Sequence, residues 1–97
     1  MKLKLTTTAK KELKVINVRI MEDDSAYDKL TEHEILLTDA ELYVEGAYED
    51  NEFDNLEEWC SNVGQSEYDP KYLKKHPNVV IEKINKMINK DLLVVAE

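Results

Sequence analysis

The middle of this chain is acidic and its two ends are basic, which limits the folds and partners open to it. Residues 22–69 hold seventeen acidic side chains and one lysine, a net charge of −16. Residues 1–21 carry +5 and residues 70–97 carry +3, so the whole chain has a net charge of −8. Exposed ion pairs between oppositely charged segments contribute only about 0–1 kcal/mol each. Such pairs cannot cancel the character of the acidic segment.

The bulk composition predicts one folded domain spanning residues 1–97. A charged share of 35% would favour disorder in a chain poor in apolar residues, but 42% of this chain is hydrophobic and arrives in clusters. The single cysteine, Cys60, excludes an internal disulfide and is typical of a reducing compartment. No apolar run is long enough to span a membrane, and the N-terminus does not resemble a secretory signal. We therefore expect a cytoplasmic protein.

Several short apolar runs have the pattern of β-strands. Residues 1–6 alternate between lysine and leucine, which is strand periodicity. Residues 13–20 predict a second strand that forms a hairpin with the first, with a bulge where the apolar parity changes. The triplet at 35–37 and the uncharged run at 92–96 predict two more strands.

Residues 39–48 are ambiguous between helix and strand. Thr38 and Glu41 match a helix capping box, in which the two side chains cap each other's backbone N–H groups. The residues that follow have high β-propensity, so we favour a strand over Glu41–Tyr48 and leave the helix open.

Helices are predicted in the second half of the chain and once in the first. Asp54 and Glu57 form a capping box for a helix over 54–63, which Gly64 would end. Asp69 and Pro70 begin a short helical segment that extends to residue 75, and Ser25 could cap another over 26–33. Asn78 precedes a last helix whose apolar stripe consists of Val80, Ile81, Ile84, Met87 and Ile88. Together these elements predict an α+β fold: a small antiparallel or mixed sheet of about four strands with two to three helices packed on one face.

The segment 45–58 concentrates acidic and aromatic side chains, and we predict that it binds a partner. On a strand, alternate side chains lie about 6.6 Å apart, and on a helix the side chains at positions i and i+4 lie about 5–6 Å apart. Duplex DNA carries one charge per roughly 1.7 Å of its axis, so a fixed row of carboxylates could occupy part of a nucleic-acid-binding cleft. Trp59 lies on an apolar helical stripe and is expected in the core. The predicted partner-binding residues are Glu45, Tyr48, Glu49, Asp50, Glu52, Phe53, Asp54, Glu57 and Glu58.

Other kinds of site are not favoured by the sequence. A calcium loop counted from Asp50 would need Gly at its sixth position and Glu at its twelfth, which are Asn55 and Ser61. The two histidines have no zinc-ligand spacing, and Cys60 has no histidine near it in sequence. The lysines of the last helix and of residues 71–75 form a modest basic cluster, typical of a solvated face. We therefore predict no catalytic residue, no cofactor and no metal site.

In size, charge and its mixture of acidic and aromatic residues, the chain resembles small acidic proteins of phages and mobile elements that inhibit DNA-acting host enzymes. Anti-restriction, anti-CRISPR and glycosylase-inhibitor proteins are of this type. The resemblance implies a non-enzymatic, DNA-mimicking inhibitor that binds a basic nucleic-acid-binding protein and neither nucleic acid nor a membrane directly. If a phage encodes the protein, the resemblance places it in the host cytosol. The alternative is an assembly module that associates with itself through sheet edges, as a homodimer for example, with acidic charge for solubility only.

Overall fold

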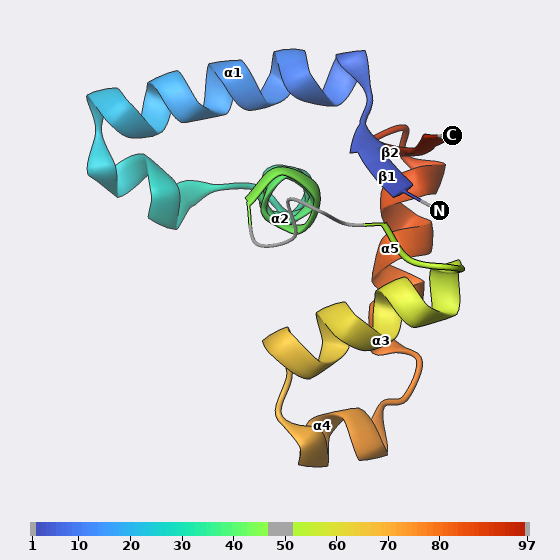
Figure 1. The fold of residues 1–97 in the computed structure, drawn as a ribbon. Helices are drawn as coiled ribbons and strands as arrows, with labels where there is room; N and C mark the ends of the chain where they lie inside the picture. The colour runs from blue at the N-terminus through green and yellow to red at the C-terminus, as the bar shows by residue number, and fades with distance from the viewer. Residues whose placement is uncertain (1, 47–51, 97) are drawn as a thin grey trace.

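In the computed structural model, residues 2–46 and 52–96 are described, and helices account for 73% of them. A short strand lies near each end of the chain, and the other regular elements of the described residues are helical (Figure 1). In chain order the elements are β1 (Lys2–Leu5), α1 (Thr7–Glu22), the 3₁₀-helix η1 (Asp24–Lys29), α2 (Glu32–Glu41), the π-helix η2 (Leu42–Gly46), α3 (Leu56–Glu67), α4 (Pro70–Lys75), α5 (Val79–Asn89) and β2 (Leu93–Ala96).

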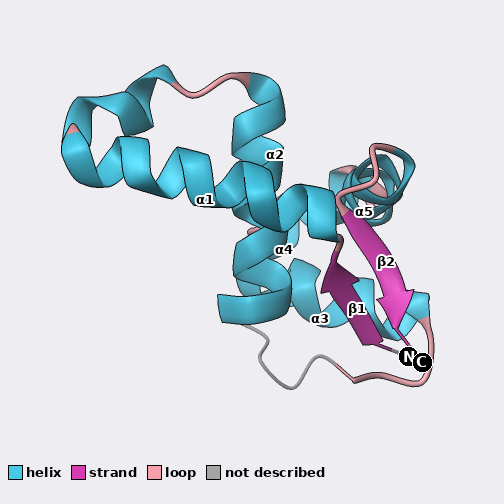
Figure 2. Cartoon of the chain, turned by 90° about the horizontal axis from the view of Figure 1, so that it is seen from above, coloured by secondary structure: helices cyan, strands magenta, loops and turns pink. Residues whose placement is uncertain are grey.

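The two strands pair with each other and bring the chain ends together (Figure 2). They run antiparallel, with Leu3 opposite Val95 and Leu5 opposite Leu93. The Thr6 N–H extends the ladder by donating to the Leu92 carbonyl over 3.1 Å. Leu3, Leu5 and Leu93 are buried, so one face of this small sheet covers the core.

The core lies where α5, α3 and the end of α2 meet below the sheet. The apolar stripe of α5 points inward, and Ile84 is completely buried. Trp59 of α3 is also fully buried, and its ring meets the Tyr43 ring edge-on at 6.1 Å between centroids. These residues come from the acidic middle and the basic C-terminal part, so both contribute to one core.

The predicted strand over residues 13–20 is wrong, because this segment belongs to the helix α1. Ala9, Leu13 and Ile16 are buried and Ile20 is half-buried, at spacings of four, three and four residues, which is the period of a helix. Val15 is 66% exposed on the other side. The β-branched residues suggested a strand, but burial of this stripe against the rest of the protein outweighs their propensity.

The predicted strands at 35–37 and 41–48 are also wrong where the structure describes them. Residues 35–37 lie inside α2, which begins with a capping box formed by Thr31 and Glu34 and not by Thr38 and Glu41. α2 continues into η2, which buries Tyr43 and Val44. Residues 47 and 48 lie outside the described residues.

The predicted α+β fold with a sheet of about four strands is therefore contradicted. The described residues form one two-stranded antiparallel sheet, and β1 pairs with β2 instead of with the segment after it. The sheet loses its predicted central strands because 13–20, 35–37 and 42–46 are helical. The fold is therefore predominantly helical, and the pairing of its two strands holds the two ends of the chain together.

The helices of the second half are confirmed, with shifted ends. Asn55, one residue later than predicted, caps α3, and α3 runs through Gly64 to Glu67. A Cβ atom at Gly64 would lie 3.3 Å from Val80 Cγ2, so this glycine permits close packing of α3 on α5. Asp69 caps α4 as predicted, with Pro70 in its first turn. Asp23, not Ser25, caps the helical turn η1, which ends at residue 29.

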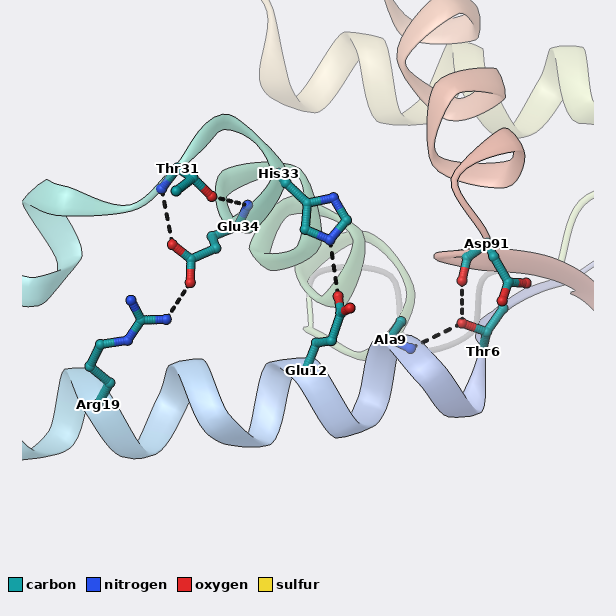
Figure 3. Close-up of polar contacts among 8 residues, drawn as sticks. All are labelled: Thr6, Ala9, Glu12, Arg19, Thr31, His33, Glu34 and Asp91. Atoms are coloured by element: carbon teal, nitrogen blue, oxygen red, sulfur yellow. Dashed lines mark hydrogen bonds and ion pairs between the residues drawn. The ribbon is translucent and has the colours of Figure 1, made fainter.

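Polar contacts hold the long helix α1 against α2 (Figure 3). Arg19 pairs with the carboxylate of Glu34, whose other oxygen accepts from the Thr31 N–H. About two turns closer to the start of α1, the carboxylate of Glu12 lies 3.0 Å from the His33 ring nitrogen Nε2. The pKa of Glu34 lies below its usual value mainly because its carboxylate accepts a hydrogen bond from the Thr31 backbone N–H. The hydrogen bond from Arg19 lowers this pKa further.

A pair of substitutions distinguishes the helix from the predicted strand. Leu13 and Val15 would share a face in a strand, but the helix buries Leu13 and exposes Val15. We expect Leu13→Ala to lower the free energy of unfolding by about 2–5 kcal/mol and Val15→Ala by less than about 0.5 kcal/mol. Urea titrations followed by circular dichroism measure both; equal losses would contradict the helical register.

Candidate acidic binding surface

The predicted binding residues lie in two places in the structure. Glu52, Asp54, Glu57 and Glu58 are exposed at the start of α3, and we call these four the α3 acidic end. Glu45 is exposed on η2, where it lines a separate groove together with Lys10 and Lys14 of α1. The remaining acidic candidates, Glu49 and Asp50, and the aromatic candidate Tyr48, lie outside the described residues.

Backbone and side-chain bonds fix the conformation of the α3 acidic end. The Asn55 side chain accepts from the Glu58 N–H over 2.9 Å, and the Glu58 carboxylate accepts from the Asp54 N–H over 3.2 Å. Lys2 of β1 and Glu52 form an isolated antiparallel bridge, which ties the segment before the helix to the sheet. The positive end of the helix dipole favours the negative charges of Glu57 and Glu58 in the first turn. The carboxylates are thus displayed from a defined backbone.

The aromatic residues of this region serve the core more than the surface. Phe53 is half-buried and packs against the core, which leaves part of its ring for a partner. Trp59 is fully buried, as its place on the apolar stripe predicted. A partner at the start of α3 would therefore contact carboxylates more than aromatic rings.

The ion pairs of the described residues leave the α3 acidic end uncompensated. They use other acidic side chains, those of Glu12, Glu34, Asp39 and Glu67. Of the four residues at the start of α3, only Glu58 accepts a hydrogen bond through its carboxylate within the described part of the chain. Three exposed carboxylates therefore stand within six residues with neither an ion pair nor a capping role there.

The ammonium group of Lys83 makes half-buried polar contacts that the sequence did not reveal. Lys83 therefore does not belong to the solvated basic cluster predicted for the last helix. Its ammonium lies 2.8 Å from Asp39, 4.0 Å from Glu67 and 5.3 Å from the centre of the Tyr43 ring. Burial acts to lower the pKa of Lys83, but the hydrogen bond and charge of Asp39 outweigh it and raise that pKa. Burial, reinforced by Glu67, raises the pKa of Tyr43. The i, i+4 spacing of Asp39 and Tyr43 is visible in the sequence, but no local pattern places Lys83 of α5 beside them.

The histidines occupy separate surface positions. His33 faces Glu12, whereas His76 packs on the Tyr72 ring at 4.6 Å, and Tyr72 in turn stacks on Tyr68 at 5.5 Å. Within residues 2–46 and 52–96, no three side chains of His, Cys, Asp or Glu are grouped so that they could hold a metal ion. This aromatic row along α4 was not predicted, although its i, i+4 spacing is visible in the sequence.

Comparison of the chain with protein-family models, with curated proteins and with solved structures finds no match. None of the helices in the described part of the chain has both the length and the apolar character required to cross a bilayer.

The buried thiol of Cys60 is expected to be unreactive in the folded protein. Burial raises its pKa to about 11 from an ordinary value of 9.0, so its thiolate fraction near neutral pH falls about a hundredfold. We expect a thiol reagent such as DTNB at pH 8 to react at least about a hundred times faster with the urea-unfolded chain. Equal rates would mean that Cys60 is accessible.

The role of Lys83 can be compared with that of Lys86 on the same helix. Lys83→Met leaves the half-buried Asp39 without its cation, and we expect a loss of about 1–2 kcal/mol in the free energy of unfolding, between the values for exposed and buried pairs. Lys86 is exposed, so Lys86→Met should change stability little. Chemical unfolding of the two variants tests this; similar losses would assign Lys83 to the solvated face.

Proposed function

We propose that this protein is a non-enzymatic binding protein that inhibits a nucleic-acid-handling protein by occupying its basic cleft with the α3 acidic end. The observation that supports the proposal is the set of exposed, uncompensated carboxylates at Glu52, Asp54 and Glu57. A basic cleft that evolved to hold phosphates attracts such a group through the same charges.

Rigid display strengthens this proposal. The bridge between Lys2 and Glu52 and the side-chain bonds of Asn55 and Glu58 hold the backbone that carries the carboxylates before a partner arrives. A preorganised surface loses less conformational entropy on binding than a disordered acidic tail of equal charge. Because the attraction is between exposed charges, affinity should fall as salt screens it.

A charge-neutralising variant tests the proposal. Glu52→Gln, Asp54→Asn and Glu57→Gln remove three charges with little change in shape and leave the capping carboxylate of Glu58 intact. The immobilised protein would be exposed at low salt to a nuclease-treated bacterial lysate, eluted with a salt gradient and read by mass spectrometry. We expect a nucleic-acid-binding protein that is retained by the wild type and lost with the triple variant.

The matched control removes the same amount of charge far from α3. Glu22, Asp24 and Asp28 lie exposed around η1, at the opposite end of the molecule from the start of α3 (Figure 1). Their conversion to Gln, Asn and Asn should leave capture unchanged. The purified partner should also release a fluorescent DNA or RNA oligonucleotide when the protein is added. Equal losses in both variants, or an affinity that is flat with salt, would favour acidic charge that serves solubility only.

A further inference from the structure

The face of α3 that carries Glu57 continues into a groove between α3, α4 and the start of α5. Ser61 and Gln65 follow Glu57 at intervals of four residues, which places all three side chains on one face of the helix. Figure 1 shows α3 and α4 next to each other, with the loop after α4 leading to the start of α5. One wall of the groove therefore begins at the α3 acidic end, to which Glu57 belongs.

Apolar side chains form most of the groove. Its base consists of Val80 and Cys60, which are buried. Its sides consist of Leu73, Pro77 and Ile81, each of which exposes part of its surface to solvent. An apolar side chain that enters the groove would exchange water for these apolar neighbours, which is favourable.

The groove has room for one large side chain. Its volume is about 380 Å³, near the lower limit of the roughly 300–1,000 Å³ that is usual for small-molecule sites. An aromatic side chain suits such a space because it brings a large apolar surface on few rotatable bonds. Side chains of this kind commonly dominate the binding energy of protein interfaces.

The charge at the groove determines the chemistry of its occupant. Among the described residues that line it, Glu57 is the one charged group, and Glu52 and Asp54 precede it closely in the chain. An acidic segment would be repelled by these carboxylates. An uncharged apolar segment would remove water from Glu57 without supplying a counter-charge, which is costly. A cation beside the apolar side chain avoids both penalties.

We propose that the groove receives a large apolar side chain of the partner protein, and that a lysine or arginine next to this side chain pairs with Glu57. This pairing rests on the function proposed above, since both concern one partner. Carboxylates alone attract many basic clefts and mainly speed the encounter. An apolar side chain buried beside them restricts binding to partners that carry both groups at matching positions.

Two synthetic peptides test this pairing on the wild-type protein. In one peptide a single phenylalanine stands between lysines, and in the other serine replaces the phenylalanine. Their charges are equal, so both should bind at low salt, but the phenylalanine peptide should bind at least about tenfold more tightly. Fluorescence anisotropy measures the two affinities. In NMR spectra, the methyl signals of Leu73 and Ile81 should shift on addition of the phenylalanine peptide only.

A groove-filling substitution locates the preference for phenylalanine. Ser61 is exposed on α3 and lines the groove, so Ser61→Trp should block the groove in a protein that circular dichroism shows to be folded. The tenfold preference should then disappear, while the affinity for the serine peptide stays unchanged. Asn17→Trp makes a comparable change at an exposed position of α1, away from α3, and should keep the preference (Figure 1).

Separate results would overturn the groove and the function proposed above. Equal affinities of the wild type for the two peptides, including no measurable binding of either, would overturn the groove. A preference that survives Ser61→Trp in folded protein would do the same. Glu52→Gln combined with Asp54→Asn removes two charges outside the groove and should weaken both peptides by the same factor. Serine-peptide binding that neither salt nor this double substitution reduces would contradict the α3 acidic end as the charged surface, and with it the proposed function.

Discussion

The pairing of the two ends of the chain is the contact on which the rest of the structure depends. β1 and β2 are separated by almost the whole sequence, so closing them costs much chain entropy. Burial of three leucines of the sheet and of the apolar stripe of α5 beneath it offsets this cost.

The turn between α5 and β2 has a defined backbone geometry. Asp91 takes a left-handed backbone conformation, φ 60°, and the Leu92 N–H reaches back to the Met87 carbonyl over 2.9 Å. The Thr6 hydroxyl, which caps α1, also donates to the Asp91 carbonyl, so both ends are joined at one point (Figure 3).

Sequence patterns were reliable where one period was unambiguous and failed where two were present. The alternation of Lys and Leu in β1 and the 3.6-residue stripe of α5 each fit one structure only, and both were predicted. In α1, Leu13 and Val15 fit a strand, while Leu13 and Ile16 fit a helix. Propensity favoured the strand because valine and isoleucine are common there. Val15 faces water because of where the core lies relative to α1, and a local sequence pattern holds no information on that position.

Two capping boxes compete for the start of α2, and their context separates them. Thr38 and Glu41 match the same pattern as Thr31 and Glu34, but the residues before Thr38 already belong to a helix whose apolar side is buried. A capping box is informative only where the preceding residues are not helical.

The half-buried contact of Lys83 could not be predicted for a related reason. It joins α5 to α2 and α3, and the relative placement of these helices comes from packing alone. The acidic candidates at the start of α3 were predictable because charge, unlike packing, is a property of the segment itself.

The acidic side chains of this protein divide into those that build the fold and those that do not. Asp23 and Asp69 cap helices, Glu34 completes the capping box of α2, the Glu58 carboxylate accepts from the Asp54 N–H, and Asp39 neutralises Lys83. Much of the excess of acid in the middle segment therefore has a local cause, since helix starts favour negative charge. Glu52, Asp54 and Glu57 differ from these residues: none of the three carboxylates forms an ion pair or a capping bond among the described residues, although the helix dipole favours the charge of Glu57 in the first turn of α3. Their mutual repulsion lowers stability, and no cation among the described residues offsets it by an ion pair; this is the physical ground for the proposed cationic partner.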